Sequence, residues 1–273
     1  MKTLICVRDL PHAAATVHFG GLMAGVQRTP VTLMTVMVGD DTEDEAEHRL
    51  AQAGELLGAP TVDMKIRKGE PAAEILEEVE AEGYNLIVVG ARTGMSVLRS
   101  LFARPVARRV AKEARVCVLV VNQDRLRLGR ILFFTAGELD EDVITVGARV
   151  AKAAEADVTL LHVANPVPSM YTGLEAMEET LEELLQTDTP VAGHLRKAAR
   201  YLAGEGVKAE LQLRHGVAQD EILREAKKGD YDLIVIGPGP MSGSLRNLVM
   251  DNVTAQVVDH APCPVLVVRG GCV

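Results

Sequence analysis

Two glycine-rich stretches offer backbone N–H groups that could bind a phosphate. Gly90-Ala-Arg-Thr-Gly94 and Gly237-Pro-Gly-Pro-Met-Ser-Gly243-Ser each follow an apolar run of strand type. Glycine lets the backbone approach an anion closely, and a helix that starts after the loop adds its positive N-terminus. A tight turn that needs positive φ is the simpler explanation of each loop, so both interpretations stay open.

Short apolar runs alternate with amphipathic stretches and would position these loops. The runs are rich in Val, Ile and Leu without alternation, which is typical of parallel strands buried on both faces. Residues 71–81 have helical spacing, and four acidic residues lie mostly outside the apolar face: Glu74, Glu77, Glu78 and Glu80. Alternating strands and helices predict a doubly wound parallel α/β sheet with right-handed crossovers.

The chain repeats itself. The segment Tyr84-Asn-Leu-Ile-Val-Val-Gly90 matches Tyr231-Asp-Leu-Ile-Val-Ile-Gly237, 147 positions later, and Val118–Val121 matches Val265–Val268 at the same spacing. Earlier in each half the spacing is 127, as between Val31 and Val158. We therefore predict two copies of one five-stranded domain, residues 1–124 and 128–273.

The difference between the two spacings places 20 extra residues in the second copy, within 165–190. An acidic stretch near 172–187 has leucines at helical spacing. It is interpreted as an amphipathic helix packed on the second copy, with a lid over a site or a contact between chains as the alternatives.

Composition narrows the classes of function. The net charge of −9 argues against non-specific binding to nucleic acid, and no apolar run is long enough for a membrane helix. Cys6, Cys117 and Cys263 lie in or beside apolar runs and are expected to be small buried residues in a reducing compartment. A cytoplasmic location is predicted.

In sheets of this kind ligands bind beyond the carboxyl ends of the strands, where the winding direction reverses, here between strands 1 and 4 of each copy. We expect strand 1 to end at Asp9 and Ala136, and strand 4 to end at Gly90 and Gly237. Both glycine loops would then lie at such a reversal. His162, which ends the second strand of the second copy, is interpreted as a structural residue rather than a catalyst.

The chain resembles the universal stress protein family, twice over. The likeness rests on the strand that ends in glycine and its loop, on Asp259-His-Ala-Pro-Cys-Pro-Val-Leu-Val-Val, and on the segments that begin at Gly69 and Gly216. It implies the sheet order 3-2-1-4-5 of the adenine nucleotide alpha hydrolase-like fold. It also implies pairing of two domains through their last strands, here Val118–Val121 with Val265–Val268. A homodimer of the whole chain would be a further level of assembly.

ATP-binding members of that family carry Gly-x-x-Gly and then Gly-Ser or Gly-Thr, with Asp at the end of strand 1. Here Thr93 and Pro240 replace the second glycine, Arg104-Pro105 and Asp251-Asn252 replace the later pair, and only the first copy keeps the Asp. Pro238 and Pro240 also lack N–H donors. The resemblance thus implies a nucleotide site in the first copy more than in the second. Its candidate residues are Asp9, Val36, Gly90, Arg92, Thr93, Gly94 and Arg104, and, in the second copy, Val163, Gly237, Gly239, Gly243, Ser244 and Asn252.

The leading hypothesis is a stress-response protein without enzymatic activity, in which ATP or another adenine nucleotide, with Mg²⁺ if it accompanies the phosphates, acts as a signal or structural ligand. One alternative is a scaffold that binds protein partners and no nucleotide. The other is an enzyme that slowly hydrolyses ATP, for which Asp9 is the candidate catalytic side chain.

Overall fold

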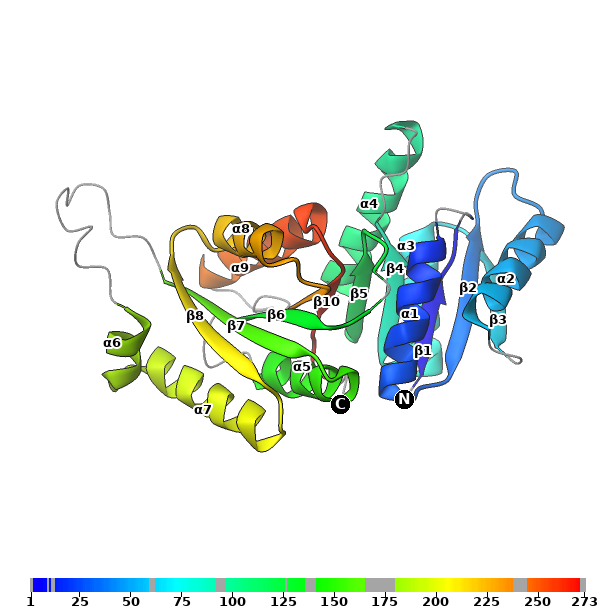
Figure 1. Ribbon diagram of the computed structural model, residues 1–273. Helices are drawn as coiled ribbons and strands as arrows, with labels where there is room; N and C mark the ends of the chain where they lie inside the picture. Colours follow the sequence, from blue (N-terminus) through cyan, green and yellow to red (C-terminus); the bar gives the residue numbers. More distant parts are fainter. Residues whose placement is uncertain are drawn as a thin grey trace.

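The computed structural model describes residues 2–8, 10, 13–58, 62–91, 97–125, 127–135, 141–164, 180–237 and 245–270, with the backbone alone for 97–104 and 245–252. Helices cover both faces of one long, twisted sheet (Figure 1). This is the α/β architecture that the alternating apolar and amphipathic segments predict.

The first half alternates strictly between strand and helix. Its elements are β1 (Thr3–Cys6), α1 (Ala14–Gln27), β2 (Val31–Met37), α2 (Glu43–Leu57), β3 (Asp63–Lys68), α3 (Pro71–Glu82), β4 (Leu86–Gly90), α4 (Val97–Glu113) and β5 (Cys117–Val121).

The second half repeats this pattern with one additional helix. Its elements are β6 (Arg130–Thr135), α5 (Glu141–Ala154), β7 (Asp157–Ala164), α6 (Leu181–Gln186), α7 (Pro190–Gly204), β8 (Ala209–His215), α8 (Ala218–Gly229), β9 (Leu233–Ile236), α9 (Leu245–His260) and β10 (Val265–Val267). The additional helix α6 begins with a capping box at Thr180 and buries Leu184 in the core of this half. It therefore packs on the second half, as expected, and the rest of the acidic stretch lies outside the described residues.

Strand order confirms the predicted winding. In the first half it is β3-β2-β1-β4-β5, and in the second β8-β7-β6-β9-β10, all parallel within each half. The winding reverses between β1 and β4, and again between β6 and β9. β4 ends at Gly90 as predicted, whereas β1 ends at Cys6, β6 ends at Thr135, and β9 ends one residue before Gly237.

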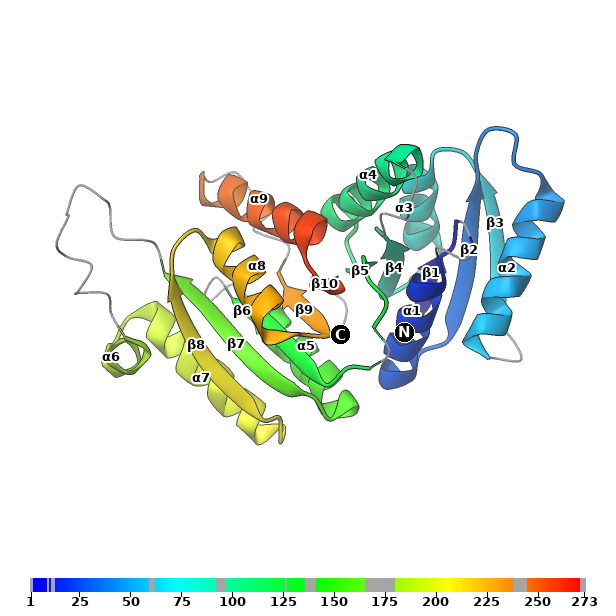
Figure 2. The same cartoon turned by 45° about the horizontal axis from the view of Figure 1, so that its top comes forward.

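The halves join through their last strands, as the resemblance implies. β5 and β10 pair antiparallel, with Val118 opposite Val267 and Val120 opposite Val265, and the hydrogen bonding runs on through ten strands. Two sheet edges that could bind other chains are thereby covered. On one face α4 and α9 meet above this junction (Figure 2).

Each face of the sheet carries its own hydrophobic cluster. Neighbouring strand residues point to opposite faces, so Ile5 and Leu4 belong to different clusters. The cluster with Ile5 lies under α1, α2, α5 and α7, and the cluster with Leu4 lies under α3, α4, α8 and α9. Leu119 of β5 and Leu266 of β10 belong to the first cluster. The core is thus continuous across the junction of the two halves.

A buried carboxylate stabilises the edge of the sheet in the first half. Glu78 of α3 is 1% exposed and accepts hydrogen bonds from Arg67 at 2.8 and 2.9 Å and from the Tyr84 hydroxyl at 3.2 Å. Lys65 lies 2.7 Å away. The expectation that Glu78 lies outside the buried face was wrong, because these partners compensate the charge inside the protein.

The second half repeats this arrangement 147 positions later. Glu225 is 5% exposed and accepts hydrogen bonds from Arg214 at 2.6 Å and from Tyr231 at 3.1 Å. The repeat therefore includes a buried charged group as well as the apolar residues.

Two side chains cross the junction and bind the helix ends of the opposite half. Arg269, after β10, is 6% exposed and donates to the carbonyls of Ala111 and Lys112 at 2.7 and 2.8 Å. At the equivalent place after β5, Asn122 donates to the carbonyl of Ala261 at 2.6 Å. The last carbonyls of a helix have no partner within it, so both contacts satisfy acceptors that would otherwise be exposed or unpaired.

The cysteines differ from expectation at one position. Cys6 and Cys263 are free thiols, and burial raises the pKa of each to about 12. Cys117 is disulfide-bonded and so is not the reduced thiol that its apolar surroundings predict. Among the described helices none is long and apolar enough to cross a membrane.

Candidate functional site

The first candidate site lies where β1 and β4 run side by side and the winding reverses. Val36 is buried near the end of β2, and Gly90 is the last residue of β4. The adjacent backbone is held by a hydrogen bond from the Val7 N–H to the Met34 carbonyl at 2.7 Å. Parallel strands thus bring these two candidate residues to one edge of the sheet, where this fold type binds its ligands.

Gly90 is required by close packing. A Cβ atom at this position would lie 2.6 Å from the Thr16 hydroxyl of α1. The glycine has no left-handed φ, so the tight-turn explanation does not apply to it. A side chain here would force the Thr16 hydroxyl, or α1 with it, to move.

Most of the other candidate residues cannot be placed. Val163 lies in β7 and Gly237 follows β9. Arg104 and Asn252 lie in α4 and α9, where only the backbone is described. The candidates outside the described residues are Asp9, Arg92, Thr93, Gly94, Gly239, Gly243 and Ser244.

Arg8 is a candidate that the sequence analysis missed. It stands two residues after the end of β1, at the carboxyl edge of the sheet, and it is exposed. In the sequence it stands between an apolar strand and Asp9, and a charged residue at that place indicates only that the strand has ended. A guanidinium at this edge can donate to a phosphate or a carboxylate.

In the second half the same edge carries a buried polar cluster. His162 of β7 donates from Nδ1 to the carbonyl of Thr135 at 3.2 Å, and Nε2 of His194, on α7, lies 2.7 Å from the Thr135 hydroxyl. All three residues are less than 9% exposed. The cluster agrees with a structural role for His162. Sequence offered no signal for His194, because it reaches this edge from a helix 59 positions away from Thr135.

The corresponding residues of the first half are different. Thr35 stands where His162 does, and its hydroxyl accepts a hydrogen bond from Arg49 at 2.9 Å. Arg8 stands in the place of Thr135 and is exposed rather than buried. The first half therefore presents an arginine at this edge, whereas the second half fills it with the buried side chains of Thr135, His162 and His194.

The carbonyl of Gly237 is held by a hydrogen bond within the second half. The Thr254 hydroxyl of α9 donates to the Gly237 carbonyl at 3.0 Å and is buried. Its counterpart in the first half is Ala107, which has no hydroxyl. The loop after β9 thus begins from an anchored residue. No group of His, Cys, Asp and Glu in the described part of the chain could hold a metal ion.

The imidazole of His162 should make the stability depend on pH. Burial is the largest influence and lowers its pKa, and the nearby His215 lowers it further, against the hydrogen bond to Thr135 that raises it. A lowered folded-state pKa means that the unfolded chain binds the proton more tightly. Stability is then full above the unfolded pKa of about 6.5 and falls as the pH drops below it.

We expect the His162→Asn variant to lose much of this pH dependence, because the amide can keep the hydrogen bond to Thr135 but does not titrate. Between about pH 7.5 and about pH 5.5 the wild type should lose at most about 1.4 kcal/mol per pH unit from this group. Thermal unfolding at both pH values measures it. The matched control is His260→Asn, since His260 is exposed and also contacts a carbonyl through Nδ1, at 3.0 Å. Equal slopes in the wild type and His162→Asn would contradict the assignment.

The chain contains two doubly wound domains, each with a reversal of winding, that join at their last strands. This arrangement defines a tandem doubly wound α/β protein. The model of the universal stress protein family matches residues 1–122 and again 128–269. The chain belongs to the universal stress protein family and contains two of its domains.

Individual relatives agree with this assignment. A universal stress protein from Methanocaldococcus jannaschii is 32% identical over 120 residues, which are 44% of this chain and 69% of the relative. One from Bacillus subtilis is 28% identical over 137 residues, 48% of this chain and 92% of the relative. The crystal structure of a universal stress protein from Archaeoglobus fulgidus has a TM-score of 0.71 at 17% identity, covering 98% of this chain and 96% of its own, and shows the same fold.

Proposed function

We propose that this protein is a stress-response protein that binds an adenine nucleotide such as ATP, as a signal or structural ligand, in its first domain. The observation that carries the proposal is the difference between the two carboxyl edges. The first domain has exposed Arg8 two residues after β1, whereas the second has the buried cluster of Thr135, His162 and His194. A polyphosphate needs cationic partners, and only the first edge offers one among the described side chains of these strand ends.

In the proposed site Gly90 keeps the backbone close to α1, Val36 forms an apolar wall for the base, and Arg8, Arg92 and Arg104 bind phosphate. Asp9 accepts from the adenine or the ribose, and Thr93 and Gly94 line the phosphates. Mg²⁺ would accompany the nucleotide through its phosphate oxygens. The second-domain candidates, from Val163 to Asn252, form the weaker site.

Isothermal calorimetry with ATP tests this proposal. We expect one ATP to bind tightly per chain, with at most weak binding in the second domain. Arg8→Gln and Asp9→Asn should each lower the affinity of the tight site by about tenfold or more, because each change removes a charge-assisted hydrogen bond. Arg115→Gln is the matched control, since Arg115 is an exposed arginine on the loop between α4 and β5. His162→Asn should bind ATP like the wild type.

No heat of binding with millimolar ATP, and no nucleotide retained by the purified protein in mass spectrometry, would contradict nucleotide binding. The scaffold alternative would then stand, and the filled edge of the second domain already favours it for that domain. Release of phosphate from ATP that disappears in Asp9→Asn would instead favour the slow hydrolase.

We further propose a cytoplasmic location, domain limits of 1–124 and 128–273, and the homodimer as the form in which whole chains associate. Fractionation of cells, limited proteolysis and light scattering test these points in turn.

A further inference from the structure

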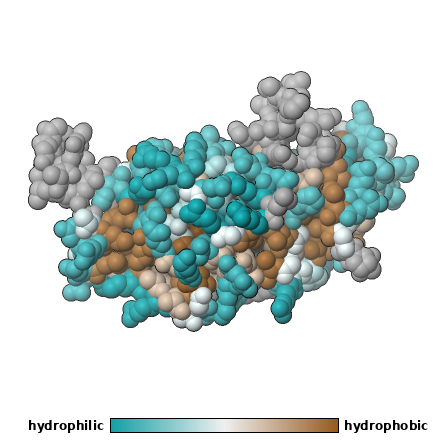
Figure 3. Space-filling view, viewed as in Figure 1, coloured by the Kyte–Doolittle hydropathy of each residue, from teal (hydrophilic) through white to brown (hydrophobic). Residues whose placement is uncertain are grey.

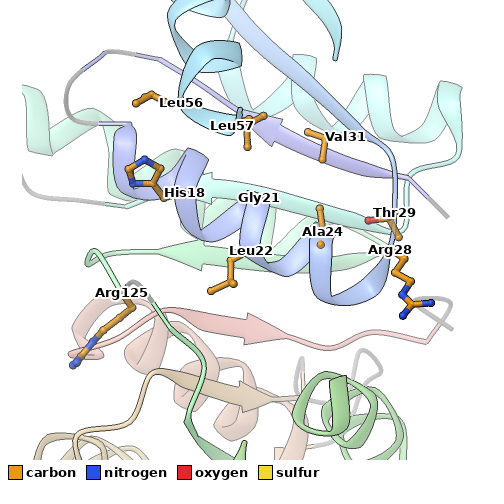
Figure 4. Close-up of a pocket in the computed structure, with 11 residues that line it drawn as sticks. His18, Gly21, Leu22, Ala24, Arg28, Thr29, Val31, Leu56, Leu57 and Arg125 are labelled. Atoms are coloured by element: carbon orange, nitrogen blue, oxygen red, sulfur yellow. The ribbon is translucent and has the colours of Figure 1, made fainter. Parts of the chain in front are cut away.

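A groove with a volume of about 430 Å³ lies over the outer face of α1. Gly21, Leu22 and Gly25 of α1 and Leu57 of α2 line it. Leu57 packs closely against Gly21, whereas the space over Gly25 is open. Figure 4 shows Leu57 and Val31 on one side of the helix and Leu22 on the other. In the space-filling view, hydrophobic residues gather over α1 and the adjoining part of the first domain (Figure 3).

The repeat shows that the fold does not require this groove. On α5, the counterpart of α1, Arg149 stands in place of Leu22 and Lys152 in place of Gly25. Lys152 is exposed and forms an ion pair with Glu205 at 3.0 Å. α1 carries no Asp, Glu, Lys or Arg over its length. The same helix surface is therefore charged in one domain and apolar and hollow in the other.

The groove is lined by arginine and by no carboxylate among its described residues. Arg28 lies at the end of α1 opposite to His18, as Figure 4 shows. Arg125 also lines the groove, but it forms an ion pair with Asp230 at 3.0 Å. Arg28 is exposed and forms no ion pair with any described carboxylate, although the chain has a net charge of −9.

The backbone turn at Arg28 does not explain its charge. Arg28 has a left-handed φ of 53° where α1 ends, and its counterpart Glu155 has a φ of 52° where α5 ends. Both residues form the same turn with opposite charges. The cation at the end of the apolar groove is thus a property of the first domain alone.

We propose that this groove binds a small amphiphilic anion of the fatty-acid type, with its apolar chain along Leu22, Leu57 and the open Gly25 and its carboxylate at Arg28. The volume lies within the range of about 300–1,000 Å³ that is usual for small-molecule sites. The groove includes Thr29 and Val31, at the start of β2. The end of the groove that holds Arg28 therefore lies at the amino edge of the sheet, opposite to the carboxyl edge where the nucleotide is proposed to bind, and the two proposals stand or fall separately.

Decanoate, kept below its micelle concentration, is the probe for calorimetry with the full chain. We expect saturable binding at one site, and affinities lower by about tenfold or more for Gly25→Leu, which fills the groove, and for Arg28→Asn, which removes the cation. A Cβ atom added at Gly25 meets nothing within 4 Å, and asparagine tolerates the turn at Arg28, so both variants should fold. The cation decyltrimethylammonium should bind at least about tenfold more weakly than decanoate.

Matched controls are Gly193→Leu, at another open helical glycine on α7, and Arg115→Asn, at an exposed arginine away from α1. Both should bind decanoate like the wild type, and ATP should not displace it. The proposal is overturned if decanoate does not bind, if Gly25→Leu and Arg28→Asn bind it as well as the controls do, or if the cation binds equally well. Binding to anionic vesicles but not to monomeric decanoate, or a dimer that Gly25→Leu dissociates, would also overturn it.

Discussion

The Glu78→Ala substitution is expected to lower the free energy of unfolding by about 3 kcal/mol, the largest loss from a single side chain that we foresee. The change leaves the buried Tyr84 hydroxyl and the cations of Lys65 and Arg67 without their shared acceptor. The loss is at the lower end for a broken buried ion pair, because the side chains of Lys65 and Arg67 stay 33% and 26% exposed. Urea unfolding followed by circular dichroism measures it.

The neighbouring residue is the control. Glu77 lies on the same helix, 3.7 Å from Arg67, but its side chain is 71% exposed. Glu77→Ala should therefore cost less than about 0.5 kcal/mol. Equal losses in the two variants would show that the buried arrangement contributes nothing beyond a surface ion pair.

Acid should reduce the difference between the wild type and Glu78→Ala. Burial alone would raise the pKa of Glu78, but hydrogen bonds from Lys65 and Arg67 outweigh it and lower the pKa below the ordinary value. The stabilisation by this carboxylate is then full above the unfolded pKa of about 4.3 and is lost as the pH falls through the lower folded pKa. The two unfolding curves should approach each other below about pH 4.

The second large effect is expected at the junction of the domains. Arg269→Met should lower the free energy of unfolding by about 2–3 kcal/mol, because it removes charged hydrogen bonds and leaves two carbonyls at the end of α4 without a donor. The backbone near the junction should also open more often than the rest of the sheet. Hydrogen exchange at Leu119 and Leu266, on the two paired strands, should accelerate more than exchange in β2 or β7.

Arg108 provides the comparison for this variant. It also crosses the junction, to Asp259 at 3.4 Å, but its side chain is 54% exposed. Arg108→Met should change stability by less than about 1 kcal/mol. If both variants unfold alike, the contact of Arg269 with the helix end is not what couples the domains.

Most of the fold could be predicted because its signals are local or repeated. Parallel strands buried on both faces appear as apolar runs, and the constant spacing of 147 between Gly90 and Gly237 revealed the duplication. The pairing of β5 with β10 followed from the resemblance and not from any local pattern. The disulfide at Cys117 had no signal of its own in the sequence.

The buried carboxylates were missed because a helical pattern assigns every acidic residue to solvent. Their burial depends on a strand and a tyrosine elsewhere in the chain. A signal was nevertheless present, since Arg67, Glu78 and Tyr84 recur together as Arg214, Glu225 and Tyr231. A repeated charged residue is a better indication of a buried ion pair than its place on one helix.

From the sequence, the candidate site could be assigned to the carboxyl edge of the sheet but not to particular contacts. The positions of Val36 and Gly90 follow from the strand pattern, and Arg8 could have been added from its place after β1. The pairing of His194 with Thr135 could not, because it depends on how a helix that follows the extra residues packs against β6.

Joining both partners in one polypeptide has a consequence for inheritance. When two identical subunits pair, every mutation is present in both, and a change that empties one binding site empties its twin. Here β5 and β10 belong to the same chain, so a substitution alters one side and leaves the other as it was. Among the residues that the structure describes, the buried cluster of Thr135, His162 and His194 occurs in the second domain only, and the groove on α1 occurs in the first domain only. Each domain is thus free to specialise while the pair stays together.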